Sequence, residues 1–132
     1  MYILRYILFA CLLSLLHIST VCAQWIQTGP YGGDIRSFAV SGSYLFAGTY
    51  GNGVLLSTNG GSSWTQVNNG LTNMYVFAFA VSDTNLFAGS DGGGVFLSTD
   101  NGSSWTAVNT GLTYPYIRAL AVSGTNLFAG TY

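Results

Sequence analysis

The sequence predicts an all-β fold assembled from four-stranded antiparallel sheets, and two observations lead to that prediction. The first is an internal repeat: LFAG occurs at 45–48, 86–89 and 127–130, and SSW occurs at 62–64 and 103–105, always 41 residues apart. The second is composition, because 18 glycines and 15% aromatic residues accompany only 5% charged residues. Such a composition is typical of β-strands joined by tight turns.

Each repeat contains four strand-like runs separated by turn residues. In the first copy the runs are IRSFAVS (35–41), YLFAGTY (44–50), GVLLSTN (53–59) and WTQVN (64–68). Four short antiparallel strands in one period of this length form one blade of a β-propeller. Helical repeats of similar length are disfavoured by the glycine and β-branched content. The sequence therefore predicts a partial β-propeller of four-stranded blades.

The repeat also sets the expected order of elements along the chain. We expect a signal peptide at 1–23, then an incomplete propeller at 24–132, made of an outer strand at 24–34, blades at 35–75 and 76–116, and a partial blade at 117–132. Fewer than three whole blades do not close a ring, so we interpret the chain as a fragment of a propeller of roughly six to eight blades. A truncated gene model and the assembly of several short chains into one ring are the alternatives.

The N-terminus has the layout of a secretory signal peptide. Arg5 precedes an apolar run at 6–16, and Val21, Cys22 and Ala23 follow a polar stretch, which predicts cleavage after Ala23. The apolar run is shorter than the roughly 20 residues of a spanning helix, so no transmembrane anchor is expected after cleavage. A lipoprotein with Cys22 acylated is the weaker alternative. The predicted location is secreted, periplasmic or at the cell surface.

Composition after residue 23 excludes several classes of function. No Lys, Glu, His or Cys follows that position. The charged residues that remain are Arg36, Arg118, Asp34, Asp83, Asp91 and Asp100. Most acid–base chemistry lacks its usual side chains, and a nucleic-acid partner lacks a basic face. We expect no cofactor and no metal, and we do not expect catalysis by this chain alone.

Two segments share a motif, STNGGSSW (57–64) and STDNGSSW (98–105). They fit the pattern S-x-D-x-G-x-[ST]-W and resemble the Asp-box, or bacterial neuraminidase repeat, of a β-propeller family. That family includes sialidases, other glycoside hydrolases, sortilin-type receptor domains and photosystem II assembly-factor-like proteins. The resemblance covers essentially all of the chain after residue 23. With the 41-residue spacing it is specific for fold and poor for function.

We interpret the box residues as structural. They lie between the third and fourth strands, where Asp and Ser side chains accept bonds from nearby backbone N–H groups, Gly takes positive φ and Trp covers the apolar layer. The resemblance implies that this turn lies on the outer rim of the propeller. The structural positions are Ser57, Asn59, Gly61, Trp64, Ser98, Asp100, Gly102 and Trp105. A calcium loop is the rival interpretation, but the segments supply too few carboxylate ligands.

The candidate binding residues are Arg36, Tyr75, Tyr116 and Arg118. The two arginines share one position of the repeat and the two tyrosines share another, both near the start of the innermost strand. A ring of Arg and Tyr suits sugars, carboxylates or an acidic segment of a protein partner. The alternative is that each arginine reaches solvent or caps a strand end. Asp91 is predicted to be a turn residue.

These observations favour a secreted or surface-exposed, non-catalytic binding or scaffold module with a protein or glycan partner. The alternative is the N-terminal part of a sialidase-like exo-glycoside hydrolase. The resemblance implies that such an enzyme relies on an arginine triad and a Tyr–Glu pair, and glutamate does not occur in this sequence. Its carboxylates would have to come from blades outside this chain. A protein-docking assembly factor is a third hypothesis.

Overall fold

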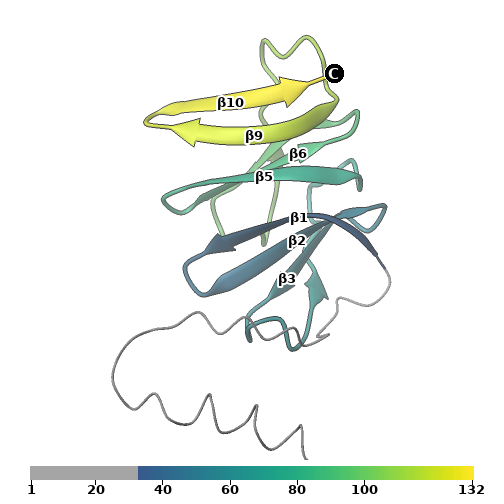
Figure 1. Cartoon of the computed structure of the whole chain (residues 1–132), viewed down its shortest axis with the longest axis vertical. Coiled ribbons are helices and arrows are strands. Elements are labelled where there is room, and N and C mark those ends of the chain that lie inside the picture. The colour runs from purple at the N-terminus through teal and green to yellow at the C-terminus, as the bar shows by residue number, and fades with distance from the viewer. Residues whose placement is uncertain (1–32) are drawn as a thin grey trace, which may run out of the picture.

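A computed structural model describes residues 33–132 of the chain (Figure 1), and these residues form ten β-strands and no helix. The first sheet contains β1 (Asp34–Ser41), β2 (Tyr44–Tyr50), β3 (Val54–Ser57) and β4 (Thr65–Gln66). The second contains β5 (Val76–Ser82), β6 (Asn85–Ser90), β7 (Gly94–Ser98) and β8 (Thr106–Ala107). The third contains β9 (Ile117–Ser123) and β10 (Asn126–Thr131). No element in this range is a helix long and apolar enough to span a bilayer.

Neighbours in sequence are neighbours in each sheet, and all pairs are antiparallel. The strand orders are β1-β2-β3-β4 and β5-β6-β7-β8, with β9 paired to β10. The predicted all-β class with four-stranded antiparallel sheets is thereby confirmed. The third and fourth strands are shorter than expected. Ladder pairing in β3 stops at Ser57, whose hydroxyl accepts a bond from the following loop. The predicted signal peptide and most of the predicted outer strand lie outside the described residues, and Asp34 begins β1.

The three sheets are stacked through their first strands. Strand β1 packs against β5, and β5 packs against β9, so β1, β5 and β9 lie one above another along the long axis of the molecule (Figure 1). Single antiparallel bridges, Tyr50 with Tyr75 and Asp91 with Tyr116, tie the end of each second strand to the start of the next sheet. The N-terminal ends of the first strands therefore meet at one side of the stack.

The hydrophobic core lies between the first two sheets. It is formed by buried aliphatic and aromatic side chains that come from both sheets and from the segments joining them, namely Phe46, Val54, Leu71, Val76, Leu86, Ala88, Phe96 and Trp105. Phe79 and Val81 of β5 are half-buried and pack against this cluster, while Ala78 and Ala80 of the same strand are buried. Both sides of β5 are thus covered, which explains the nearly continuous apolar run in its sequence.

A β-bulge interrupts the first strand of each sheet at the same position of the repeat. The register shifts between Ile35 and Ser37 in β1, between Val76 and Ala78 in β5, and across the equivalent stretch of β9. The unpaired residues are Arg36, Phe77 and Arg118. A bulge bends the strand and re-aims the side chain at the extra residue, so the three copies present these side chains in the same way.

Candidate binding surface

The three bulges bring the two arginines to the same phenylalanine. The guanidinium carbon of Arg36 lies 5.4 Å from the ring centroid of Phe77, and that of Arg118 lies 4.2 Å from it. Because β5 lies between β1 and β9, the two cations approach Phe77 from the two flanking sheets. Both distances are within the range of a cation–π attraction.

Two tyrosines continue this arrangement. Arg36 lies 5.2 Å from the ring centroid of Tyr50, and Arg118 lies 4.5 Å from that of Tyr132. Each tyrosine belongs to the second strand, or its end, in the same sheet as its arginine. We call Tyr50, Arg36, Phe77, Arg118 and Tyr132 the cation–aromatic row.

Each arginine in the row also has an aspartate partner. Arg36 pairs with Asp34 two residues earlier in the same strand, and both side chains are exposed. Arg118 pairs with Asp91 of the second sheet at 3.0 Å, and both are less than one-third exposed. The Nε of Arg118 is buried and has no hydrogen-bond partner. The row therefore holds two cations whose charges are locally balanced, one within a sheet and one between sheets.

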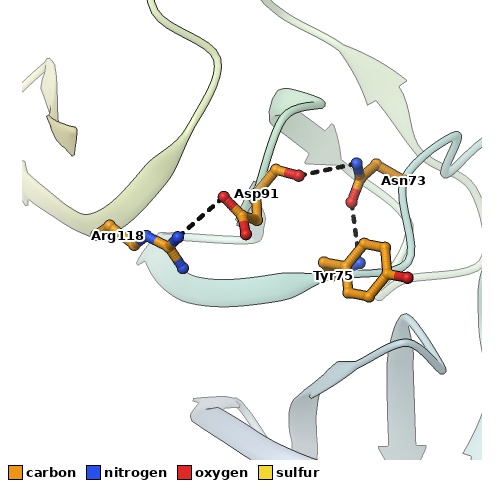
Figure 2. Close-up of polar contacts among 4 residues, drawn as sticks. All are labelled: Asn73, Tyr75, Asp91 and Arg118. Atoms are coloured by element: carbon orange, nitrogen blue, oxygen red, sulfur yellow. Dashed lines mark hydrogen bonds and ion pairs between the residues drawn. The ribbon is translucent and has the colours of Figure 1, made fainter. Parts of the chain in front are cut away.

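Asn73 links the Arg118–Asp91 pair to the start of β5 (Figure 2). Its side-chain amide donates to the backbone carbonyl of Asp91 at 3.1 Å and its oxygen accepts from the backbone N–H of Tyr75 at 2.9 Å. The backbone of Asp91 in turn donates to the carbonyl of Tyr75 at 2.9 Å. This network fixes the turn after β6 against the segment that leads into β5, so the carboxylate of Asp91 is held toward β9.

Five exposed tyrosines, two of which belong to the row, form a second feature of this side of the stack. We call Tyr50, Tyr75, Tyr114, Tyr116 and Tyr132 the tyrosine surface, since all five side chains are exposed. The ring of Tyr75 lies 4.7 Å from that of Tyr50, and the ring of Tyr116 lies 5.4 Å from that of Tyr114. Aromatic rings and guanidinium groups that are held by one another lose little freedom when a ligand covers them.

The structure brings some of the predicted binding residues together and separates others. Arg36 and Arg118 meet across Phe77, whereas Tyr75 contacts Tyr50 edge-to-face and Tyr116 contacts Tyr114 in a tilted arrangement. The set therefore forms two clusters of tyrosines beside one row. Sequence reasoning missed the roles of Tyr50, Phe77 and Tyr132, although each shares a repeat position with a residue that was singled out or placed in a turn.

The sequence predicts Asp91 to be a turn residue, and the structure gives it a second role as the partner of Arg118. The available signal was its place in the repeat, where Tyr50 and Tyr132 occupy the equivalent positions. An acidic residue replaces an aromatic one at the point where the next sheet presents an arginine. The sequence alone does not pair Asp91 with Arg118, because the two side chains meet only when the second and third sheets are stacked.

In the second box segment, Ser98 and Asp100 organise the turn after β7. The hydroxyl of Ser98 accepts from the backbone N–H of Gly102 at 2.8 Å and donates to Asp100 at 2.8 Å. The carboxylate of Asp100 accepts from the backbone N–H of Ser104 at 2.9 Å and from its hydroxyl at 2.6 Å. These bonds, above all those from Ser104, lower the pKa of Asp100 below its usual value.

The first box segment forms the same turn with an amide. Gly61 donates to the hydroxyl of Ser57 at 2.8 Å, and Ser63 donates to the side-chain oxygen of Asn59 at 2.9 Å. Asn59 then donates its amide to the hydroxyl of Ser63 at 2.8 Å, reversing the direction of the equivalent bond in the second segment. Gly61 and Gly102 both have positive φ, 89° and 83°. The turn therefore does not depend on a negative charge.

The two tryptophans that end the box segments differ in their surroundings. The indole N–H of Trp105 donates to the carbonyl of Val67, the residue after β4 of the first sheet, at 2.7 Å, and the side chain is 4% exposed. The indole N–H of Trp64 donates to Gly61 of its own turn at 3.0 Å, and its side chain is half-buried. Trp105 thus fastens the second sheet to the first one.

Residues 33–132 contain no group of three or more His, Cys, Asp or Glu side chains placed to hold a metal ion. Their four aspartates are spread over the described fold: two pair with arginines, Asp100 serves the turn described above, and Asp83 occupies a left-handed position with φ 54°. No model of a protein family matches the chain. No curated protein matches it either.

Proposed function

We propose that the chain is part of a secreted or surface-exposed β-propeller and acts as a non-catalytic binding or scaffold module. The described sheets would be its blades, with β1, β5 and β9 as the inner strands. The regular 41-residue spacing, the stacking through first strands and the recurrence of one bulge in all three sheets support this proposal. The box turns, including Asp100, would be structural fasteners.

The observation that carries the binding role is the cation–aromatic row framed by the tyrosine surface. Tyr and Arg are among the side chains that are enriched in the centres of protein interfaces. Each arginine already has a carboxylate partner, so a strongly anionic ligand would have to displace Asp34 or Asp91. The row therefore favours a partner that offers apolar area and hydrogen-bond acceptors over a polyanion. We propose that this partner is a protein face.

A binding assay with matched variants tests this function. The chain is immobilised and probed with the secreted proteins of its source, with neutral oligosaccharides and with sialyllactose. A genuine partner should be lost when Tyr75 and Tyr116 are changed to alanine. It should be retained by Val108→Ala, which alters another exposed apolar residue. The unfolding midpoints of all variants are measured in parallel.

Each outcome of this assay supports a different function or a different binding site. A protein bound by the wild type and by Val108→Ala but not by the tyrosine variant supports the proposal. Binding of a neutral oligosaccharide with the same dependence would replace the protein by a glycan. Release of sialic acid from sialyllactose would replace binding by catalysis, and a retained partner that ignores the tyrosine changes would locate the site elsewhere.

A further inference from the structure

Each internal interface between sheets contains one apolar residue seated against one glycine. A Cβ placed on Gly48 of the first sheet would lie 2.8 Å from a methyl of Val76 in the second sheet. A Cβ placed on Gly89 of the second sheet would lie 2.5 Å from a methyl of Ile117 in the third. Only glycine permits this approach, and the two contacts are related by the repeat.

The repeat contains a third residue of each kind, and these two do not meet each other in the described fold. Ile35 occupies the position of Val76 and Ile117, yet it is half-buried where they are fully buried. Gly130 occupies the position of Gly48 and Gly89. The nearest heavy atoms to a Cβ placed on Gly130 all belong to Ala119 of its own sheet. Among the described residues, the first sheet thus has an apolar residue, Ile35, with no glycine against it, and the third sheet has a glycine, Gly130, with no apolar residue of another sheet against it.

Around these two positions, too, apolar side chains are exposed although their counterparts elsewhere in the repeat are covered. Phe79 and Val81 pack against the core, whereas their counterparts in β1, Phe38 and Val40, are 58% and 65% exposed. At the other end of the stack, Phe128 is 56% exposed. Its counterpart Phe46 is fully buried, beneath the box turn of the following sheet. Exposed apolar side chains gathered in this way mark an interaction surface.

Strand pairing places the exposed Phe128 and the unoccupied Gly130 on the same side of the third sheet as two alanines. Phe128 lies opposite Ala121, and Gly130 lies opposite Ala119. Both alanines are exposed, although Ala78 and Ala80 at the same positions of β5 are buried. We call Ile35, Phe38 and Val40 the leading face, and Ala119, Ala121, Phe128 and Gly130 the trailing face. The strands that carry them, β1 for the leading face and β9 with β10 for the trailing face, lie at opposite ends of the stack in Figure 1.

We propose that the leading face of one copy of this chain packs on the trailing face of a second copy, repeating the contact that already joins its own sheets. Ile35 would be seated against Gly130, as Ile117 is against Gly89 within the chain. The same superposition brings Arg36 to Tyr132, a cation to a ring, where the internal interfaces bring Phe77 to Tyr50 and Arg118 to Asp91. The two surfaces are therefore complementary in shape and in side-chain chemistry.

Because the two faces differ, the association is head-to-tail. Each added copy leaves one leading face and one trailing face free, so association continues beyond a dimer. The trailing face is built on the two-stranded third sheet, whereas the interface between the first two sheets joins four strands on each side. The contact between copies is accordingly weaker than the one between the first two sheets, and because it joins separate molecules it depends on protein concentration.

A complementation experiment tests the proposal on the full chain, with mass measured by sedimentation velocity over roughly two orders of magnitude in concentration. Val40→Glu blocks the leading face, and Ala121→Glu blocks the trailing face. Each variant alone should stay monomeric, because a carboxylate buried without a partner weakens the contact by at least about tenfold. An equimolar mixture should form a 1:1 dimer and nothing larger, since one intact face of each kind remains. Val108→Glu, at an exposed apolar site on neither face, should associate like the wild type.

Other outcomes overturn the proposal. These are a wild type that stays monomeric throughout, single variants that still associate, a mixture that does not dimerise, or a Val108→Glu chain that loses association equally. Association that survives both glutamates but is lost when proline is introduced into β10 would mean edge-to-edge strand pairing instead. Phe38→Ser and Phe128→Ser provide a second pair of blocked faces, and the unfolding midpoint of every variant shows that it has folded.

Discussion

The guanidinium of Arg118 lies 4.2 Å from the ring centroid of Phe77, although the two residues belong to neighbouring sheets. Arg36 approaches the same ring from the first sheet at 5.4 Å. One phenylalanine thereby connects three sheets, and the recurring bulge is what aims all three side chains at one another. Because the row arises from one repeated position, the repeat contributes both to the stability of the stack and to the surface proposed for binding.

Replacing Phe77 by leucine should weaken the stack, because leucine keeps apolar volume but removes the ring that both cations contact. We expect the free energy of unfolding in urea to fall by about 1–2 kcal/mol. Phe77→Tyr keeps the ring and should stay within about 0.5 kcal/mol of the wild type. Equal stability of the leucine variant and the wild type would show that the row does not stabilise the fold.

The two arginines should contribute unequally. Arg118 pairs between sheets and is 29% exposed, whereas Arg36 pairs within its own strand and is 40% exposed. We expect Arg118→Met to lower the free energy of unfolding by about 1–2 kcal/mol and Arg36→Met by less than about 0.5 kcal/mol. Added salt should narrow the small effect at Arg36 further. A larger loss of unfolding free energy in Arg36→Met than in Arg118→Met would contradict the view that the less exposed ion pair between sheets stabilises the fold more.

The glycines at the sheet interfaces provide a comparison inside one chain. An alanine methyl at Gly89 would lie 2.5 Å from a methyl of Ile117, and one at Gly48 would lie 2.9 Å from the backbone carbonyl of Val76. Relieving these overlaps requires the sheets to separate, so each variant should lose about 1–3 kcal/mol in chemical denaturation. Gly130→Ala has only a 3.2 Å contact with Ala119 and should lose far less. Similar losses at all three positions would argue that the sheet spacing is not set by the glycines.

Much of the fold follows from the sequence alone. The repeat and the turn residues predicted the all-β class and the four-stranded sheets, because alternating side chains and glycine-rich turns are local properties of the chain. The strand β2 has the bounds 44–50 that the sequence predicted. The shorter third strand was missed, since the hydroxyl of Ser57 turns to bond Gly61 instead of continuing the ladder.

The candidate surface was predictable only in part. Arg36 and Arg118 stood out because they are rare cations at one repeat position. Their meeting across Phe77 depends on bulges and on sheet stacking, and neither feature has a signature in a single strand. Asp91 illustrates the same limit: its turn is legible in SDGGG, but its partner lies 27 residues later in another sheet.

The last prediction concerns Asp100, whose folded-state pKa is lowered by the hydrogen bonds from Ser104 and then from Ser98. A lowered pKa means that the ionised form stabilises the fold above the unfolded-state pKa of about 3.9, and that this contribution disappears as the pH falls through the folded-state value. Asp100→Asn removes the titration while keeping the acceptor, as Asn59 does in the first box segment. We expect the wild type to lose its advantage over Asp100→Asn as the pH is lowered from about 6 to about 2.

The alanine variant separates the acceptor from the charge. Asp100→Ala removes the bonds to Ser104 and should lower the unfolding midpoint by a few degrees at neutral pH. Asp100→Asn should lie between that variant and the wild type, close to the latter. Thermal unfolding of the three proteins across the same pH range measures both effects. An alanine variant as stable as the wild type at neutral pH would refute the role of Asp100 in stabilising the turn. Asp100 would then be the first residue to examine for a part in ligand binding.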